Sequence, residues 1–352
     1  MFYFHNDYNE ACHLKVAQKM ADWSTKQMPG YGVDECCKRA ADLIRKRCGR
    51  EDIAVHFLVG GTQANLTVIN AALRPHQAVI GAVSAHINVH EAGAVEATRH
   101  KIITVTSQNG KLTADQVREI VRPHYAEAEP EHMVQPKLVY ISNPTELGTI
   151  YSLGELQAIF AVCREYGMYL FLDGARLGYG LAAKSNDICL SDLVRLCDVF
   201  YIGGTKVGAM FGEAIVISNP EIARDFRYLI KQHGAMLAKG WLLGLQFEAL
   251  FEDDLYFSIS KYAVSLADQI RNTLNELEYP LLIDGDTNQI FPVLPNDILK
   301  ELKNKFTFLE QATVDPMHTA IRLCTSWSTS QEGVDSLCAE LRRLKCRSKG
   351  ER

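Results

Sequence analysis

Short apolar segments alternate with amphipathic segments along the first 250 residues of the chain. The apolar segments are rich in β-branched and aromatic residues and have the length of buried strands; they cover residues 54–59, 78–81, 101–105, 137–142, 169–173, 199–203 and 214–218. The segments between them show the helical spacing of apolar positions, near residues 33–48, 62–74, 88–97, 113–122, 153–166 and 220–232. This alternation predicts an α/β fold with a mostly parallel sheet and helices on both faces.

The pattern changes after Leu250. A long helical pattern over residues 253–277 comes first. It is followed by strand-like segments at 289–294, 307–311 and 320–324, which alternate with helical segments at 297–305 and 331–344. We therefore predict two domains, a large α/β domain over residues 1–250 and a smaller α+β domain over residues 251–352.

The composition excludes several classes of protein. The chain has 352 residues, 47% apolar and 22% charged, with a formal net charge of −5, so it has ample apolar surface to fold. It is mildly acidic, whereas nucleic-acid binding needs a basic surface, and no apolar run has the length of a membrane helix. The first residues show no secretory signal, and none of the ten cysteines forms a Cys-x-x-Cys pair. We expect a cytoplasmic protein with reduced thiols and no nucleic-acid or membrane partner.

Two strand ends carry residues that suit one chemistry. Asp173 ends the strand at 169–173, and Lys206 follows the strand at 199–203 through a pair of glycines. They are about one strand–helix–strand crossover apart, so we expect them at neighbouring strand ends, on the ligand-binding edge of the sheet. Alone, Asp173 has an ordinary interpretation as a helix N-cap and Lys206 as a solvated side chain. Together they favour a pyridoxal phosphate (PLP) site, in which a lysine forms an imine and a carboxylate contacts the ring nitrogen.

A phosphate-binding segment is expected after the strand at 54–59. Gly60, Gly61 and Thr62 open the next helix, where glycines let backbone N–H groups approach an anion and the helix N-terminus favours negative charge. A plain strand-to-helix turn capped by Thr62 is the alternative. Thr205, beside Lys206, would add a hydrogen bond to the phosphate.

His86 follows the strand near residue 79 and would stack on a cofactor ring. His86 and His90 have the i, i+4 spacing of metal ligands on a helix. The order is not His-Glu-x-x-His, however, and no third ligand follows. We therefore predict no metal site.

These residues resemble a known family, the L-threonine aldolases of low-specificity or allo type, which are fold type I PLP-dependent enzymes of the threonine aldolase and β-eliminating lyase family. The resemblance covers nearly the whole chain and rests on five segments in order: Gly60-Gly61-Thr62-Gln63-Ala64-Asn65-Leu66, His86 with Glu91-Ala92-Gly93, Asp173-Gly174-Ala175-Arg176, Gly204-Thr205-Lys206 and Ile321-Arg322-Leu323. It implies a transferase-like fold of type I and a homo-oligomer, a dimer of dimers. The N-terminal segment and the active sites would lie at the dimer interface.

The resemblance also implies roles for individual residues. The cofactor would be bound by Gly60, Gly61, Thr62, His86, Asp173, Arg176, Thr205, Lys206 and Lys239. The substrate would be bound by Asn6, Tyr31, Arg176 and Arg322, with Tyr31 contributed by the neighbouring subunit. Arg322 would hold the substrate carboxylate, for which a bidentate guanidinium is well suited.

The chain departs from the better-known aldolases at three places. Asn6 stands where they have serine, and Lys239 stands where they have a phosphate-binding arginine. Glu146 stands where they have a histidine near the substrate hydroxyl. The predicted catalytic residues are Lys206, His86 and Glu146. Glu146 would be the base for the β-hydroxyl or only its hydrogen-bond acceptor, and His86 is the competing base.

The activity implied by the resemblance is retro-aldol cleavage of L-threonine or L-allo-threonine to glycine and acetaldehyde. Such an enzyme is a carbon–carbon lyase of threonine catabolism and glycine biosynthesis. The alternatives are another β-hydroxy-amino-acid aldolase of the phenylserine type, a β-eliminating lyase, an aminotransferase, or a non-catalytic binding protein on the same fold. The joint presence of Lys206, Asp173, Arg176 and Arg322 favours an enzyme over a binding protein.

Overall fold

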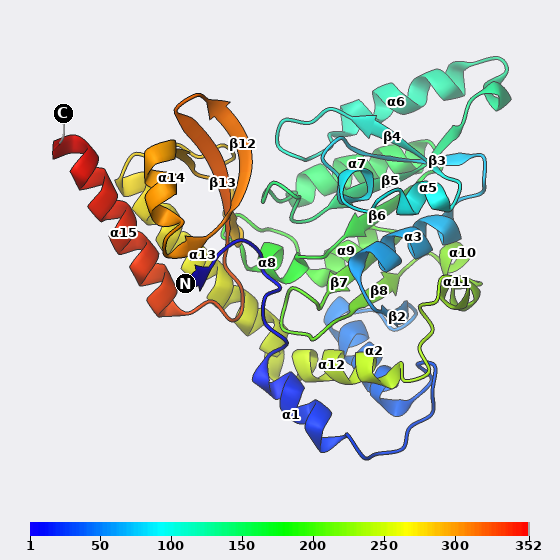
Figure 1. The fold of residues 1–352 in the computed structure, drawn as a ribbon. Helices are drawn as coiled ribbons and strands as arrows, with labels where there is room; N and C mark the ends of the chain where they lie inside the picture. Colours follow the sequence, from blue (N-terminus) through cyan, green and yellow to red (C-terminus); the bar gives the residue numbers. More distant parts are fainter. Residues whose placement is uncertain (351–352) are drawn as a thin grey trace.

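A seven-stranded sheet forms the centre of the larger of two lobes in the computed structural model, which describes residues 1–350 (Figure 1). In spatial order its strands are β2 (Ala54–Leu58), β8 (Glu213–Ile217), β7 (Val199–Gly203), β6 (Tyr169–Asp173), β5 (Gln135–Ser142), β3 (Gln77–Ala82) and β4 (Lys101–Val105). Strand β8 is antiparallel to both neighbours, and the remaining adjacent pairs are parallel. The predicted mostly parallel sheet is confirmed, and each strand predicted in this region is present.

Most of the predicted helices of this lobe are also present. They are α2 (Glu35–Cys48), α3 (Gly61–Ala72), α6 (Ala114–Ala126) and α7 (Leu153–Glu165). The helix predicted at 88–97 is instead two single turns, α4 (His86–Val89) and α5 (Ala94–Ala97). The break is at Ala92 and Gly93, whose φ angles of 51° and 75° lie in the left-handed region and cannot continue a right-handed helix. The helix predicted at 220–232 is likewise divided, into α10 (Pro220–Ala223) and α11 (Phe226–Gln232).

Several helices lack a sequence signal strong enough to be predicted. They are α1 (Leu14–Asp22), α8 (Leu177–Ala182), α9 (Leu190–Leu196) and α12 (Trp241–Phe251). Nearly every residue of α12 is buried, so its apolar positions surround the helix and leave no amphipathic pattern. Helix α8 is short and contains two glycines, which are poor helix formers.

The smaller lobe combines the C-terminal part of the chain with its first residues. An antiparallel sheet contains β9 (Gln289–Ile290), β10 (Val293–Pro295), β12 (Leu309–Asp315) and β13 (His318–Cys324), and it packs with α13 (Leu255–Glu276), α14 (Asn296–Leu302) and α15 (Gln331–Gly350). Strand β1 (Phe2–Tyr3) pairs in parallel with β11 (Phe306–Thr307), and Phe4 is buried in the core of this lobe. Two short 3₁₀ turns, Pro130–His132 and Glu252–Asp254, complete the elements of the two lobes.

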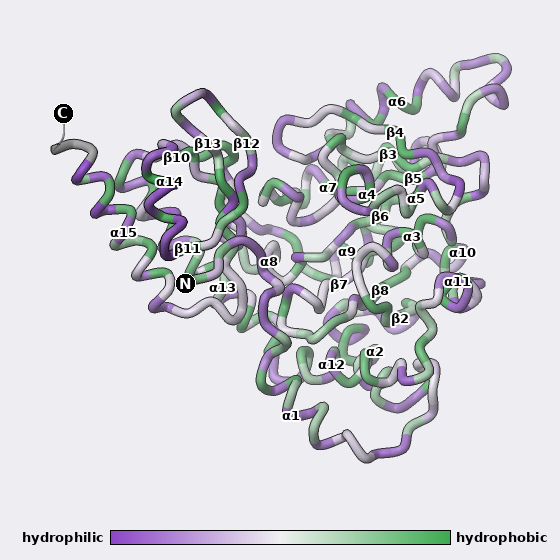
Figure 2. Tube along the Cα trace, viewed as in Figure 1, coloured by the Kyte–Doolittle hydropathy of each residue, from purple (hydrophilic) through white to green (hydrophobic). Residues whose placement is uncertain are grey.

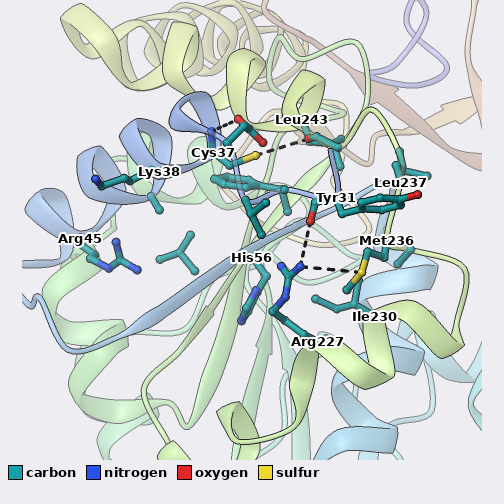
Figure 3. A pocket seen from close by; sticks show the side chains of 18 residues that line it. Tyr31, Cys37, Lys38, Arg45, His56, Arg227, Ile230, Met236, Leu237 and Leu243 are labelled. Carbon is teal, nitrogen blue, oxygen red and sulfur yellow. Dashed lines mark hydrogen bonds between the residues drawn. The ribbon is translucent and has the colours of Figure 1, made fainter. Parts of the chain in front are cut away.

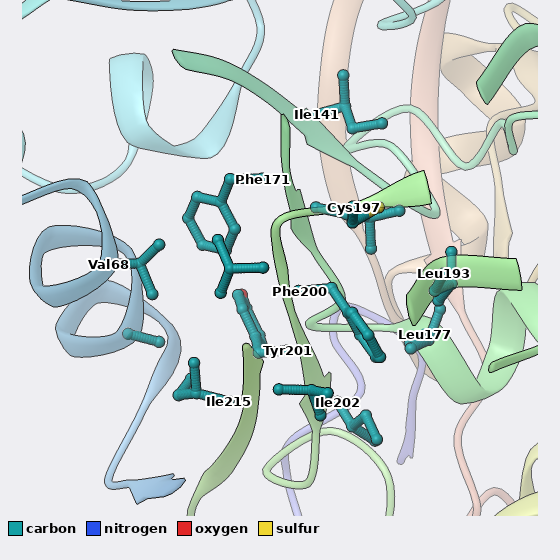
Figure 4. Packing of buried hydrophobic residues seen from close by; sticks show 14 of the residues in the cluster. Val68, Ile141, Phe171, Leu177, Leu193, Cys197, Phe200, Tyr201, Ile202 and Ile215 are labelled. Carbon is teal, nitrogen blue, oxygen red and sulfur yellow. The ribbon is translucent and has the colours of Figure 1, made fainter. Parts of the chain in front are cut away.

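The core of the larger lobe lies on both faces of the central strands. Phe171 and Tyr201 point toward α3, whereas Phe200 points to the opposite face, toward Leu177 and Leu193 (Figure 4). This alternation follows from the two-residue period of a strand. Burying each of these large side chains contributes about 1.5–3 kcal/mol. Along the chain trace, hydrophobic residues gather on the central strands and the outer loops are largely hydrophilic (Figure 2).

Two glycines allow the loop after β6 to touch the end of β7. A Cβ atom on Gly174 would lie 1.9 Å from the carbonyl oxygen of Tyr201, and one on Gly203 would lie 2.2 Å from the carbonyl oxygen of Ala175. The amide of Gly203 donates to the carbonyl oxygen of Gly174 at 2.9 Å. Because both obstructing atoms belong to the backbone, any side chain here would force the loop after β6 away from the end of β7.

We predict that Gly203→Ala lowers the free energy of unfolding by about 1–3 kcal/mol, the usual cost of overpacking. The measurement is urea denaturation followed by circular dichroism. Gly154→Ala is the matched control, because a Cβ atom there meets no heavy atom within 4 Å. The control should be neutral or slightly stabilising, since alanine is the better helix former. Equal stability of Gly203→Ala and the wild type would contradict this account of the loop contact.

Candidate active site

A cavity of about 680 Å³ opens at the edge of the sheet where the parallel strands end. Its walls come from the ends of β5, β6 and β7, the start of α3, the N-terminal segment and β13 of the smaller lobe. The predicted site residues that line it are Asn6, Gly60, Gly61, Thr62, His86, Glu146, Asp173, Arg176, Thr205, Lys206 and Arg322. Residues from seven separate regions of the sequence therefore meet in one place.

The carboxylate of Asp173 is fixed by four donors. Its Oδ2 accepts hydrogen bonds from Asn65 Nδ2 at 3.0 Å and from the hydroxyl of Tyr140 at 2.5 Å. Its Oδ1 accepts from the hydroxyl of Tyr201 and from the amide of Ala175. Asp173 is buried, and its nearest donors come from α3, β5 and β7. A buried carboxylate held in one orientation suits a contact with a cationic or protonated ring nitrogen.

Lys206 is surrounded by one arginine and three carboxyl groups. Burial lowers the pKa of Lys206 and the positive charge of Arg176 lowers it further, while Asp7, Asp173 and Glu213 act in the opposite direction. The net effect is a pKa below the ordinary value for lysine. A lowered pKa leaves more of the amine unprotonated and able to act as a nucleophile.

Glu213 was not predicted from the sequence. It is 4% exposed, lines the cavity at the start of β8, and accepts hydrogen bonds from the amide of Gly204 and the hydroxyl of Thr205. The single hydroxyl proton of Thr205 therefore goes to Glu213, while its oxygen accepts from the amide of Gly212. The predicted phosphate contact of Thr205 would require the bond to Glu213 to change.

Arg176 is paired with Asp7, which the sequence interpretation did not use. Two guanidinium nitrogens of Arg176 lie 2.7 and 3.0 Å from the Asp7 carboxylate, which also accepts from Asn288 in the smaller lobe at 2.9 Å. Burial would raise the pKa of Asp7, but the charges of Arg176 and Lys206 and these hydrogen bonds outweigh it and lower the pKa. Arg176 is therefore committed to Asp7 on two of its nitrogens.

Arg322 reaches the cavity from β13 with part of its guanidinium uncommitted. One terminal nitrogen donates to the carbonyl oxygen of His5 at 3.0 Å. Its Nε is buried and has no hydrogen-bond partner among the described residues. A buried donor without a partner is costly, and an anionic ligand would satisfy it.

His86 is oriented by Glu91. Nδ1 of His86 lies 2.7 Å from Oε1 of Glu91, whose side chain is fully buried. A carboxylate only accepts, so the ring proton lies on Nδ1 and Nε2 is the acceptor of the neutral ring. The same Glu91 oxygen accepts from Asn65 Nδ2, which also donates to Asp173. One asparagine thus links the histidine–glutamate pair to the central carboxylate.

Glu146 faces the cavity next to His86. Its Oε1 accepts from the hydroxyl of Ser142 at 2.7 Å and from the backbone amide of His86 at 2.9 Å. Burial raises the pKa of Glu146 and the charge of Asp173 adds to this, although the two hydrogen bonds partly oppose it. A carboxyl group with a raised pKa in a cavity is typical of acid–base chemistry.

The start of α3 offers an anion site beside these groups. Gly60 is the N-cap and provides no side-chain hydrogen bond, so the first amides of the helix are left without a partner from the cap. A Cβ atom on Gly60 would meet no heavy atom within 4 Å. These amides, the carboxylate of Asp173 and the amine of Lys206 together fit a group that carries both a phosphate and a ring nitrogen.

Tyr31 and Lys239 do not line this cavity. The amide of Tyr31 donates to the carbonyl oxygen of Ala238, so the two residues lie close together on the larger lobe. Tyr31 borders a separate pocket of about 220 Å³ between α2, β2 and α11 (Figure 3). Tyr31 and Lys239 are both exposed, as they would need to be to reach a neighbouring subunit.

None of the helices in residues 1–350 is long and apolar enough to cross a membrane. No cluster of three or more His, Cys, Asp or Glu side chains in this part of the chain is arranged to hold a metal ion. All ten cysteines are free thiols.

Comparison with known proteins places these features in a family. Residues 15–295 match the beta-eliminating lyase family. A low specificity L-threonine aldolase of Pseudomonas sp. (strain NCIMB 10558) is 31% identical over 321 residues, 89% of each chain. The Pseudomonas aeruginosa enzyme of the same name is 28% identical, over 92% of each chain.

Solved structures agree. A threonine aldolase of Leishmania major has a TM-score of 0.95 and 43% identity, covering 98% of this chain and all of that chain. An aspartate aminotransferase of Thermus thermophilus, at 13% identity and a TM-score of 0.72 over 97% of this chain and 91% of that chain, shares the fold alone. The sheet and the site together define a fold type I PLP-dependent enzyme. The chain belongs to the beta-eliminating lyase family, with the low-specificity L-threonine aldolases.

We predict that Asp7→Asn lowers the free energy of unfolding by about 3–5 kcal/mol, because it leaves the Arg176 charge buried without a partner. Since folding lowers the pKa of Asp7, its contribution is complete above the pKa of the unfolded chain. It is lost as the pH falls through the folded value, so acidification should destabilise the wild type more than the variant. Urea denaturation across the acidic range measures both effects.

Asp52→Asn is the control for this experiment. Asp52 pairs with Arg50 through two hydrogen bonds, but its side chain is 70% exposed. An exposed ion pair stabilises a fold much less than a buried one, because water screens its charges. Equal losses from the two variants would show that the Asp7–Arg176 pair does not stabilise the fold in the way described.

Proposed function

We propose that this chain cleaves L-threonine and L-allo-threonine to glycine and acetaldehyde. The observation that carries the proposal is the meeting of Lys206, Asp173 and Arg322 in one cavity, on a fold and in a family that are PLP-dependent. The relatives named L-threonine aldolases support this substrate class over the other reactions of the family.

The proposed cofactor contacts use the amides, the carboxylate and the amine described for the cavity. Asp173 would meet the ring nitrogen, the first amides of α3 would hold the phosphate at Gly60–Thr62, and Lys206 would supply the amine. When bound, PLP withdraws electrons from the substrate carbon that carries the amino group. Arg322 would bind the substrate carboxylate through its free donors, since Arg176 is held by Asp7.

The cleavage itself needs one base and one proton donor. The base takes the proton of the β-hydroxyl, the Cα–Cβ bond breaks as the aldehyde C=O forms, and a proton added at Cα gives glycine. Glu146 and His86 both line the cavity and lie next to each other, because the backbone amide of His86 donates to Glu146. Because Glu146 is buried with a raised pKa, we assign it the first of these roles.

The test of the function is product analysis with Lys206→Ala as the inactive variant. The wild type should take up PLP, turn yellow and form equimolar glycine and acetaldehyde from L-threonine. The alanine variant should lose the cofactor band and nearly all cleavage. A keto acid with ammonia in place of acetaldehyde would indicate the β-eliminating lyase or aminotransferase alternative. A colourless wild type that does not take up PLP would contradict the proposal altogether.

For Glu146→Gln we predict a fall in kcat of about 10²-fold if the carboxylate is the base, with the PLP spectrum unchanged. Activity limited by this carboxylate rises with pH as Glu146 ionises, and the raised pKa moves that rise above the ordinary range for glutamate. The variant should therefore lose the acidic limb of the kcat profile. Glu119→Gln, on the exposed face of α6, is the control. A loss of only several-fold would make Glu146 an acceptor and leave His86 as the base.

Fold type I PLP enzymes are typically homo-oligomeric. We propose a dimer of dimers in which Tyr31 and Lys239 complete the site of the neighbouring subunit. Their exposure on the larger lobe, outside their own cavity, supports this arrangement. Mixed dimers of Lys206→Ala and Lys239→Ala chains should regain activity, because one of their two sites has both lysines. Confirmed mixed dimers with no more activity than either parent would argue against contribution in trans.

Two broader expectations belong with this proposal. We propose a cytoplasmic location, which ten free thiols support. We also propose the division of the chain near residue 250. It is supported by separate hydrophobic cores in the two lobes, although Phe4 packs with the C-terminal core and the first part of α13 packs with the core of the larger lobe.

A further inference from the structure

Strand β8 places the carboxyl group of its first residue, Glu213, at the edge of the sheet where the cavity lies. Because β8 runs antiparallel to β7, its first residue lies where β7 ends, and Glu213 is the register partner of Gly203. The parallel strands reach this edge only with their last residues. Glu213 therefore stands beside the turn that carries Lys206.

Both oxygens of Glu213 are used to order that turn. Oε2 accepts from the amide of Gly204 at 3.0 Å, and Oε1 accepts from the hydroxyl of Thr205 at 2.9 Å. No lysine, arginine or histidine among residues 1–350 lies within ion-pair distance of Glu213, and its side chain is almost completely buried. The titratable groups that interact electrostatically with Glu213 are Lys206, Asp173, Tyr201 and Tyr256.

The other two carboxyl groups near Lys206 are already committed. Asp7 is held by both Arg176 and Asn288, and Asp173 has four donors. Burial raises the pKa of Glu213, and Lys206 is the main group that opposes this. The charge of Lys206 also lowers the pKa of Asp7, but Asp7 has Arg176 as a directly bonded cation, whereas Lys206 is the main charge that opposes the effect of burial on Glu213.

We propose that Glu213 is a positioning residue for Lys206: it holds the Gly204–Lys206 turn in place and, together with Asp7 and Asp173, supplies negative charge that stabilises the lysine as an ammonium ion. This inference rests on the proposed function, in which Lys206 is the reactive amine. When the amine becomes neutral, Glu213 loses its main stabilising charge and takes up a proton. The pair is then amine with carboxylic acid instead of ammonium with carboxylate, and its net charge is zero in both states.

The change of charge at Glu213 has a consequence for Thr205. As a carboxylate, Glu213 accepts the only hydroxyl proton of Thr205. As a neutral acid it has a proton of its own to donate to the Thr205 oxygen, which can still accept from the amide of Gly212. The Thr205 proton is then released for an anion in the cavity. The protonation state of Lys206 is thereby linked to the hydrogen bond that Thr205 can donate to a phosphate.

The test is a direct titration of Lys206 in the cofactor-free full-length protein. Lysines are labelled by reductive ¹³C-methylation, and the Lys206 signal is identified by its absence in Lys206→Arg. Glu213→Gln removes the charge and should lower the pKa of Lys206 by about 1 or more, a tenfold loss of proton affinity. Thr205→Val removes the hydrogen bond but no charge, and should leave the lysine pKa within about 0.3 of the wild type.

Two outcomes would overturn the proposal: an unchanged lysine pKa in Glu213→Gln, or an equal shift in Thr205→Val, which would indicate a structural role. If Glu213→Gln does not fold, Glu213→Asp keeps the charge and should keep the lysine pKa near the wild-type value; a fall as large as that expected for glutamine would contradict the proposal. None of these readouts needs activity. A protein without aldolase activity but with the coupled titration would refute the proposed function and leave the Glu213–Lys206 pair intact.

Discussion

The hydrogen bonds to Asp173 are the constraint on which the rest of the site depends. A buried carboxylate is costly unless its oxygens are satisfied, and here the donors come from α3, β5, β7 and the loop after β6. Each donor ties a neighbouring element to the end of β6. The phosphate segment at the start of α3 and the lysine turn after β7 are held at fixed positions by the same group that would face the ring nitrogen.

A second set of contacts joins the two lobes around Asp7. Its carboxylate binds Arg176 from the larger lobe and Asn288 from the smaller one. Arg322 then remains the arginine with a free donor in the cavity. The two arginines therefore differ: Arg176 holds the N-terminal segment, and Arg322 keeps a donor free for the proposed substrate carboxylate. The geometry of a site assembled from both lobes depends on their relative position, because a shift of the smaller lobe moves Arg322 but not Lys206.

The sequence predicts the parts of this structure that follow from local periodicity. The strand ends at Asp173 and Gly203, with the glycine–lysine turn, are visible because buried strands give apolar runs and parallel strands end at one edge. The pairing of Asp7 with Arg176 was missed, since the two residues are 169 positions apart and no local pattern connects them. Glu213 was missed for a related reason. It appears as an acidic residue before an apolar strand, and only the antiparallel direction of β8 brings it to the active edge. Helix α12 shows the opposite case, in which complete burial removes the amphipathic pattern itself.

The position of the N-terminal segment has a consequence for synthesis on the ribosome. Asp7 and Asn288 are 281 residues apart in the sequence. A ribosome needs about 14–56 s to translate a segment of that length at the usual rates. During that time the larger lobe can form its sheet, but Phe2 and Phe4 have no β11 to pack against. Residues 2–7 therefore emerge long before the residues they pack against and are among the last to reach their final positions, and the rings of Phe2 and Phe4 are open to chaperones until then.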